Sequence, residues 1–371
     1  MKLFIITINY NNAEGLRKTL ASVAAQTYPN IEHIIVDGNS TDGSVEVIRE
    51  YESTLASSLS PFASRLKWLS EPDKGIYNAM NKGIEIALGR RVVNSFNRSE
   101  LVEDKNKGIE IALGKRVVND DHTSSPLASS LSPLASKEYI QILNSGDILA
   151  APDVTERMVV ALQQCNSTAN TVSDLQQAER AIYSENSERS TASKMSDLQN
   201  WIPIFYGNMI KEWPDGKRVK DTCGGGDYTP ESFYYFYRGT LNHDCAYIRK
   251  DLFEKYGLYN EEMKICSDWE WYVRAIVLGG EKTVYTNIDV TVFDMTGISE
   301  SDGKNRALIQ KERREYLESI LPAAVLRDYD MLSLPIEQYR RLKRYHLWGI
   351  VYFVERVLFK FEKWMNKAHR R

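Results

Sequence analysis

Cysteine is scarce in this sequence of 371 residues, and its four cysteines include no C-x-x-C pair. Their wide spacing argues against a thiolate zinc site and against a disulfide framework. The sequence also has no run of about 20 uncharged apolar residues, the length that spans a bilayer. The N-terminal K-L-F-I-I-T-I-N-Y lacks the charged start and small-residue cleavage site of a signal peptide. These absences suit a reducing compartment, and we expect the protein in the cytoplasm.

Charge is distributed unevenly along the chain. The formal net charge is −3, yet residues 340–371 hold ten Lys or Arg against two acids, Glu355 and Glu362. This tail therefore carries +8, and −11 is left for the rest of the chain. Such an asymmetry predicts an anionic partner for the tail.

Short apolar runs alternate with helical patterns in the first 143 residues. The runs predict buried strands, because strands covered on both faces are apolar throughout. The expected strands are Lys2–Asn9, His33–Asp37, Leu66–Ser70 and Tyr139–Leu143, and the expected helices are Ala13–Gln26, Asp42–Tyr51 and Tyr77–Leu88. This alternation predicts an α/β fold with a mostly parallel, doubly wound sheet.

Two segments interrupt the regular pattern. The sequence N-K-G-I-E-I-A-L-G-R-R-V-V-N at 81–94 recurs at 106–119 with one change, which indicates a local duplication. We interpret residues 90–137 as an insertion and the Ser/Thr/Asn-rich residues 166–200 as a second inserted loop. Long surface insertions are tolerated because the entropy of loop closure grows slowly with length. The two insertions are either loops without a function or a lid that shapes an acceptor site.

Three of the four predicted strands run into an acidic residue, namely Asp37, Asp73 and Asp147. Ligands of doubly wound sheets bind at the carboxyl ends of the strands, so these acids are candidates for a shared site. Asp37 can accept hydrogen bonds from a base or ribose, or it can simply close its turn. Asp42, in the same turn, is better explained as a helix N-cap.

The third and fourth strand ends suggest binding of phosphate and of a metal ion. Asp73, Lys74 and Gly75 precede a helix, and a helix N-terminus favours anions. Asp147 follows a buried strand and can bind Mg²⁺ or Mn²⁺, which prefer oxygen ligands and often share a site with substrate phosphates. Such an ion neutralises charge on a leaving diphosphate.

These segments resemble glycosyltransferase family 2, of the GT-A fold. The resemblance is carried by T-I-N-Y-N at 7–11, V-D-G-N-S-T-D-G-S at 36–44, S-E-P-D-K-G-I-Y-N-A-M-N-K-G at 70–83, L-N-S-G-D at 143–147, N-H-D-C-A-Y-I-R-K at 242–250, S-D-W-E-W at 267–271 and G-I-S at 297–299. It spans residues 3–300 apart from the two insertions. The resemblance implies a nucleotide-sugar donor and transfer with inversion at the anomeric carbon by single displacement.

The resemblance also implies roles for residues at the donor site. Asp37 and Asp73 match the acids of the family that bind the nucleoside. Residues of the first strand and the loop after it, near Thr7, Asn9 and Asn11, are expected to line the base pocket.

A metal ligand and a catalytic base follow from the same resemblance. Asp147 matches the last acid of the D-x-D metal motif, in which Ser145 replaces the first acid. This replacement puts a ribose or metal contact at that position in doubt. Asp268 matches the general base that takes a proton from the acceptor hydroxyl.

The surroundings of Asp268 fit such a role or a purely structural one. Trp269 and Trp271 can desolvate the acid and raise its pKa, and their indole faces can stack on a sugar. Alternatively, S-D-W-E-W begins a helix and Trp271 packs in the core, with Glu270 on the helix surface or next to the site. His243 can approach the diphosphate or the acceptor, or it can be a core histidine.

The C-terminal tail predicts a basic amphipathic helix. Val351, Val354, Leu358, Phe361 and Met365 fall on one side, and the basic residues that flank them are Arg356, Lys360, Lys363 and Lys367. Such helices suit the surface of an anionic membrane, and no nucleic-acid partner is expected. The alternative is a helix that covers the catalytic domain or pairs with another subunit.

The sequence thus predicts a catalytic GT-A domain over residues 1–300 and a basic helical tail over residues 301–371. The expected reaction moves a sugar to a glycan or lipid-linked acceptor in cell-surface polysaccharide biosynthesis, with Mg²⁺ or Mn²⁺. A sugar nucleotidyltransferase is a rival, but the glycine-rich, arginine-containing loop of those enzymes is absent after the first strand. A non-catalytic, membrane-associated partner of a glycan assembly complex is the second alternative.

Overall fold

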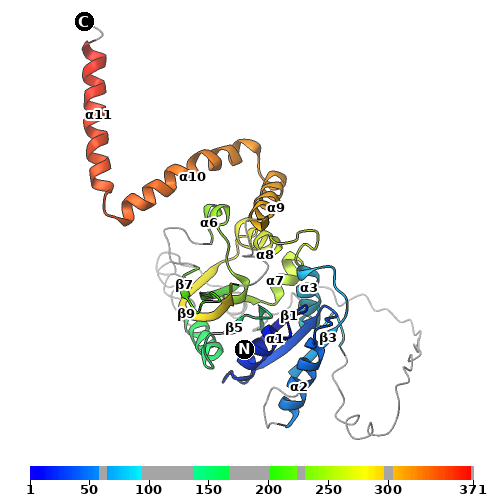
Figure 1. Ribbon diagram of the computed structural model, residues 1–371. Helices are drawn as coiled ribbons and strands as arrows, with labels where there is room; N and C mark the ends of the chain where they lie inside the picture. Colours follow the sequence, from blue (N-terminus) through cyan, green and yellow to red (C-terminus); the bar gives the residue numbers. More distant parts are fainter. Residues whose placement is uncertain (58–64, 94–137, 167–200, 224–229, 296–303, 369–371) are drawn as a thin grey trace, which may run out of the picture. The chain divides into compact units, whose positions relative to one another are not determined.

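The computed structural model describes residues 1–57, 65–93, 138–166, 201–223, 230–295 and 304–368 (Figure 1). They form two compact units, Met1–Ile309 and Gln310–Arg371. Residues 94–137 and 167–200 of the two predicted insertions lie outside the described residues.

One nine-stranded sheet organises the first unit. Its strands are β1 (Lys2–Asn9), β2 (Ile31–Asp37), β3 (Leu66–Ser70), β4 (Glu138–Asn144), β5 (Ile148–Leu149), β6 (Ile204–Glu212), β7 (Arg218–Asp221), β8 (Ala246–Arg249) and β9 (Thr283–Asp294). The strand order is β3-β2-β1-β4-β8-β6-β9-β5, and β7 pairs with β6.

Helices connect and flank these strands. In the first unit they are α1 (Ala13–Ala24), α2 (Ser44–Ser57), α3 (Ile76–Ala87), α6 (Phe233–Arg238), η3 (His243–Cys245), α7 (Asp251–Tyr256), α8 (Ser267–Tyr272) and η4 (Val273–Leu278). Helix α9 (Lys304–Ile320) runs across the boundary between the units, and α10 (Ala323–Arg344) and α11 (Trp348–Ala368) follow it.

The four N-terminal strands of the path β3-β2-β1-β4 are all parallel. Their register sets Asp37 opposite Asn9 on β1 and opposite Ser70 on β3, so the polar strand ends share one edge of the sheet. The predicted α/β alternation is confirmed here, and β1 and β3 have the predicted bounds. Beyond β4 the sheet is mixed, because β8 is antiparallel to both β4 and β6.

Helices cover both faces of the parallel strands. Ile6 of β1 faces α3, where a Cβ on Gly83 would lie 2.3 Å from the Ile6 Cγ2 atom. The next residue, Thr7, bonds to His33 at 2.9 Å, and His33 in turn contacts the Tyr51 hydroxyl of α2 at 3.2 Å. Because neighbouring residues of a strand point to opposite faces, α3 and α2 lie on opposite sides of the sheet.

The second unit consists of helical segments. Arg314 pairs with Glu318 at 2.7 Å and with Asp330 at 2.9 Å, which ties α9 to α10. The rings of Tyr339 and Trp348 meet edge to face at 4.4 Å, where α11 begins. Among the described helices, none has the length and apolar content to cross a membrane.

We predict that Gly83→Ala lowers the free energy of unfolding by about 1–3 kcal/mol, the usual cost of overpacking a core. The added methyl group would overlap Ile6, so α3 would have to move away from β1. The midpoint of urea unfolding measures this change. Gly349→Ala in α11 is the matched control, because its methyl group meets no atom within 4 Å. A Gly83→Ala midpoint equal to that of the unaltered protein contradicts the close packing.

Candidate active site

Hydrogen bonds join the loops that follow β1, β2 and β4. The Asn12 side chain caps α1 by accepting from the Gly15 amide at 3.0 Å, and it donates to the Ser145 carbonyl at 2.8 Å. Asp42 accepts from the Ala13 amide at 2.8 Å. The three loops therefore form one connected edge at the carboxyl ends of the strands, where doubly wound sheets bind ligands.

Asp37 lies fully buried at this edge and has four donors of its own. Asn9 donates to one carboxylate oxygen at 2.7 Å, and Ser70 donates to the other at 2.6 Å. Ser40 supplies its backbone amide at 2.9 Å and its hydroxyl at 2.6 Å. The carboxylate ties together the ends of three strands, which is the turn-closing role that the sequence left open for it.

The three predicted base-pocket residues differ in exposure. Thr7 is fully buried and bonded to His33, whose pKa burial lowers to about 3. Asn9 is 4% exposed and directs its amide to Asp37. Asn11 is exposed at a backbone φ of 47°, and its side chain accepts from the Thr41 amide at 2.8 Å. Asn11 is therefore the one of the three with an open surface.

Asp73 is the strand-end acid that stays partly exposed. One carboxylate oxygen accepts from the Gly75 amide at 3.0 Å. A Cβ on Gly38 would lie 2.5 Å from the other oxygen and 3.0 Å from the Tyr10 ring, so both side chains lie over this glycine. Tyr10 is 66% exposed. Lys74, the residue after Asp73, is also exposed. Asp73 and Tyr10 thus present a carboxylate and an aromatic face at the rim.

Asp147 is buried, with 3% of its surface exposed. It accepts from the backbone amide of Asp294 at 3.0 Å and from Asn144 at 3.2 Å. Burial and, next, the neighbouring Asp244 raise the pKa of Asp147 to about 8. A cation beside Asp147 would offset both effects.

Asp268, on α8, is held by two side chains from other elements. The Tyr77 hydroxyl of α3 donates to one carboxylate oxygen at 2.9 Å, and His243 Nδ1 of η3 lies 3.2 Å from the other. The side chains of Asp268 and His243 each keep 15% of their surface exposed. The carboxylate is thus positioned from two sides and still reaches the surface.

The electrostatic surroundings of Asp268 differ from the prediction. Burial alone raises the pKa of Asp268, but the hydrogen bond and charge of His243, and then the hydrogen bond from Tyr77, lower it below its ordinary value. The pKa of His243 is in turn raised, since its hydrogen bond to Asp268 and the nearby acids outweigh burial. The prediction that the pKa of Asp268 is raised is therefore wrong, because it considered the two tryptophans but neither His243 nor Tyr77.

His243 connects the base candidate to the metal candidate. Its Nε2 atom lies 3.5 Å from the Asn144 amide nitrogen, which also donates to Asp147. We call the series Tyr77–Asp268–His243–Asn144–Asp147 the polar row. It joins α3, α8, η3 and β4, so the two predicted acids belong to one connected set of side chains.

The neighbours of Asp268 in sequence point into the protein. Trp269 is 1% and Trp271 0% exposed, and their indole nitrogens donate to the carbonyls of Phe236 and Gly257, both at 2.8 Å. Glu270 is 5% exposed and pairs with Arg274 at 2.9 Å. The predicted stacking of these indoles on a sugar is wrong here, because neither has a free face.

No group of three or more His, Cys, Asp or Glu with the geometry of a metal site occurs among the residues that the structure describes. Asn144 Oδ1, next to Asp147, is buried without a hydrogen-bond partner. An oxygen of this kind beside a desolvated carboxylate fits a hard divalent cation, which often takes only one or two protein ligands and completes its shell with substrate phosphates. The residues present therefore fit Mg²⁺ or Mn²⁺.

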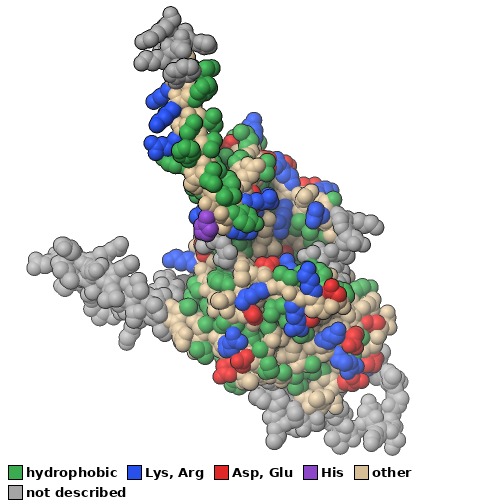
Figure 2. Space-filling view, turned by 60° about the vertical axis from the view of Figure 1, so that its left-hand side comes forward, with side chains coloured by type: hydrophobic (Ala, Val, Ile, Leu, Met, Phe, Trp, Pro, Cys, Tyr) green, Lys and Arg blue, Asp and Glu red, His purple; other side chains and the backbone are tan. Residues whose placement is uncertain are grey.

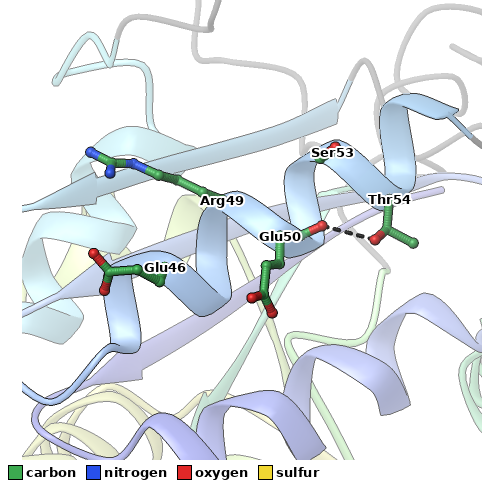
Figure 3. Close-up of a pocket in the computed structure, with 5 residues that line it drawn as sticks. All are labelled: Glu46, Arg49, Glu50, Ser53 and Thr54. Carbon is green, nitrogen blue, oxygen red and sulfur yellow. Dashed lines mark hydrogen bonds between the residues drawn. The ribbon is translucent and has the colours of Figure 1, made fainter.

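A hollow on the surface of α2 lies outside this set of residues (Figure 3). Glu46, Arg49, Glu50, Ser53 and Thr54 line it, all from one helix. Glu50 pairs with Arg17 at 2.8 Å, and the Thr54 hydroxyl donates to the Glu50 carbonyl at 2.8 Å. Its lining includes none of the predicted site residues.

Sequence reasoning missed Tyr10, Tyr77 and Asn144. Each lies inside a segment that was singled out, at 7–11, 70–83 and 143–147. Tyr10 had a usable signal, since an aromatic residue directly after a buried strand lies at the ligand edge of the sheet. Tyr77 had none, because its partner Asp268 lies 191 residues further along the chain.

Comparison with known proteins gives a family for the N-terminal segment. Residues 4–95 match the model for glycosyl transferase family 2. The chain is 43% identical over 86 residues to the Uncharacterized glycosyltransferase Rv1514c of Mycobacterium tuberculosis, covering 23% of this chain and 29% of that protein. It is 34% identical over 85 residues to a PGL/p-HBAD biosynthesis glycosyltransferase of the same species, covering 23% and 30%. The matched segments thus span less than a third of these relatives.

A solved structure, TarS 1–349 of S. aureus in complex with UDP-GlcNAc, aligns over 87% of this chain and 69% of that chain. The identity is 14% and the TM-score 0.48, a likeness that carries no functional information. The family match covers Asp37 and Asp73 and ends before Asp147 and Asp268. Residues 4–95 therefore match glycosyl transferase family 2, and the strands and helices of the first unit form the α/β fold with parallel N-terminal strands that the sequence predicted.

Proposed function

We propose that the protein is an inverting glycosyltransferase. It moves a sugar from a nucleoside-diphosphate sugar to a hydroxyl of a glycan or lipid-linked acceptor, in the biosynthesis of cell-surface polysaccharide. The observation that carries the proposal is the position of Asp268, which Tyr77 and His243 hold at 2.9 and 3.2 Å while part of its surface stays open. The family match over residues 4–95 and the similarity to a protein named PGL/p-HBAD biosynthesis glycosyltransferase support the same function.

Asp268 acts as the general base. Inverting transfer by single displacement needs one group that takes the proton of the acceptor hydroxyl while that oxygen attacks the anomeric carbon. With its pKa held below the ordinary value by His243 and Tyr77, Asp268 is ionised at neutral pH and free to accept this proton. His243 and Tyr77 orient the carboxylate and stabilise its charged form.

The donor binds at the rim formed by Tyr10, Gly38 and Asp73. The Tyr10 ring offers an apolar face to the base, and Asp73 offers acceptor oxygens for a ribose or base N–H or O–H group. Asn11 and Lys74, both exposed on the adjoining loops, extend this surface toward the base and the diphosphate.

A divalent cation would be held by Asp147, with Ser145 and the side-chain oxygen Oδ1 of Asn144 beside it. When bound, such an ion neutralises charge on the departing diphosphate. Ser145 itself binds Asn12 through its backbone carbonyl, which fixes the loop around the cation position.

We predict that Asp268→Asn lowers the rate of sugar transfer about 10²–10⁴-fold, the usual contribution of a general base. Nucleotide binding should remain, because the rim residues are untouched. Release of nucleoside diphosphate from a panel of nucleotide sugars, with a glycan or lipid-linked acceptor, measures the rate. Asp215→Asn, on the exposed turn between β6 and β7, is the control and should transfer at the unaltered rate. Full activity of Asp268→Asn rejects Asp268 as the base.

We predict that Asp147→Asn removes the effect of Mn²⁺ on nucleotide binding. In the unaltered protein, a nucleoside diphosphate should raise the melting temperature more with Mn²⁺ than without it, because the ion joins the diphosphate to Asp147. The amide has the size of the carboxyl group but lacks its charge. Equal stabilisation of the unaltered protein with and without Mn²⁺ speaks against metal assistance and favours a non-catalytic binding protein.

The tail helix α11 binds the surface of an anionic membrane in this proposal. Ile350, Phe353, Leu358 and Phe361 are each at least 55% exposed. Figure 2 shows hydrophobic side chains along one side of this helix and Lys and Arg along another. A helix with this division lies in the membrane interface, where apolar burial and attraction to anionic lipids add.

We predict that the chain co-sediments with vesicles containing phosphatidylglycerol and much less with neutral phosphatidylcholine vesicles. Lys360→Gln with Lys363→Gln should weaken the first interaction about 30-fold, since each lysine contributes about 1 kcal/mol at such a surface. Lys18→Gln with Lys264→Gln, both exposed in the first unit, is the charge-matched control. Equal binding to the two vesicle types, or a stable dimer that the lysine changes do not affect, contradicts the membrane role.

A further inference from the structure

Helix α3 is almost wholly buried and carries several polar side chains, of which the proposed reaction uses Tyr77 alone. Its sequence I-Y-N-A-M-N-K-G belongs to the segment 70–83, from which only the strand-end residues were assigned to the donor. Polar side chains inside a protein are costly unless they bond to a partner. The hydrogen-bond partners of these side chains therefore indicate which segments α3 holds in place.

One end of α3 fixes the loop that holds Asp73. Lys82 is 6% exposed, donates to the Pro72 carbonyl at 2.8 Å and pairs with Glu71 at 2.9 Å. The backbone of this loop is thus tied to the helix directly before Asp73. Helix α3 is in this way fastened to the donor side of the site.

The same helix holds the segment that leads into α8. Asn81 exchanges hydrogen bonds with the backbone of Tyr259, donating to its carbonyl and accepting from its amide, both at 2.9 Å. Asn81 and Asn78 also donate to Glu261, each at 2.9 Å. The Tyr77 ring packs against Tyr259 with ring centroids 5.8 Å apart.

Tyr77 makes the contact nearest to the proposed base. Its hydroxyl lies 2.5 Å from the carbonyl oxygen of Ile265 and 2.9 Å from Asp268 Oδ1, so its one proton is shared between the first turn of α8 and the backbone two residues before that helix. Tyr77 is 5% exposed. A phenol in this position sets both the place of the Asp268 carboxylate and the backbone that carries it.

We propose that Tyr77 is a positioning residue for Asp268, through which α3 fixes the base relative to the donor rim. The expected effects on kcat and on the pH–rate profile rest on the proposed transferase function. Its structural part, that Tyr77 orders the segment from Tyr259 to Asp268, stands on the hydrogen bonds alone.

Removing the Tyr77 hydroxyl also changes the charge balance at Asp268. The titratable groups that interact with this carboxylate are His243 of η3, Tyr77 of α3, Tyr259 of the preceding loop and Tyr272 of α8. Asp147 and Asp244 act on His243, and Cys266 acts on Tyr77. The Tyr77 hydrogen bond favours the ionised form of Asp268, so its loss raises the pKa of this acid. A base works in its deprotonated form, and the acidic limb of the pH–rate profile therefore moves to higher pH.

The test is Tyr77→Phe, which keeps the buried ring and deletes the hydroxyl. We expect kcat to fall about 10–100-fold, as for the loss of a hydrogen bond to a charged group, with KM for the donor within about twofold. In an Asp268→Asn background, Tyr77→Phe should cause no further loss, because it acts through Asp268. Tyr51→Phe is the matched control, since it removes a half-buried phenol that contacts His33 on the opposite face of the sheet.

Hydrogen exchange of the backbone amides supplies a readout that does not require activity. In Tyr77→Phe, amides of residues 259–268 should exchange faster than in the unaltered protein, while Tyr51→Phe should leave them unchanged. Asn81→Asp, which loses the donors to Tyr259 and Glu261, should accelerate the same segment.

Unchanged kcat, equal exchange in residues 259–268, or a full additional loss in the Asp268→Asn background would each overturn the proposal. If the unaltered protein transfers no sugar from any donor, the transferase function fails. Faster exchange in Tyr77→Phe would then still support the role of Tyr77 in holding the segment.

Discussion

The structure of the candidate site depends on the polar row, in which Tyr77, Asp268, His243, Asn144 and Asp147 contact one another in series. These residues come from α3, α8, η3, the end of β4 and the loop after β4, which are separated in sequence. Charged and polar groups in such surroundings are stable only when their partners are in place. The polar row therefore holds these helices and the end of β4 in place relative to one another.

Burial separates acids that support the site from acids that can meet a ligand. Asp37 is fully buried and accepts four hydrogen bonds, and these bonds connect the ends of β1, β2 and β3. Asp73, one strand further, keeps an open carboxylate next to the exposed ring of Tyr10. Two acids at equivalent strand ends thus have different chemistry, because one has neighbours that satisfy it and the other faces outward.

The sequence was sufficient for the parallel part of the fold and for the family that residues 4–95 match. A continuous apolar run marks β1 at its observed bounds, since a strand covered on both faces needs no alternation, and β3 also has its predicted bounds. It was not sufficient for side-chain direction or for distant partners. Trp269 and Glu270 looked available in the sequence but are buried by α6 and by Arg274, and the downward shift of the Asp268 pKa comes from residues 25 and 191 positions away. Such effects depend on tertiary packing, which no local pattern contains.

The central claim is that the loops after β1, β2, β3 and β4 form a single nucleotide site bordered by Asp268. Hydrogen exchange measured with and without a nucleoside diphosphate and Mn²⁺ tests it directly, because bound ligand protects the amides that it covers. The account predicts slower exchange in the segments 9–12, 37–42, 72–76 and 144–147, and in the first turn of α8. Protection confined to the hollow on α2, or to none of these segments, would contradict it.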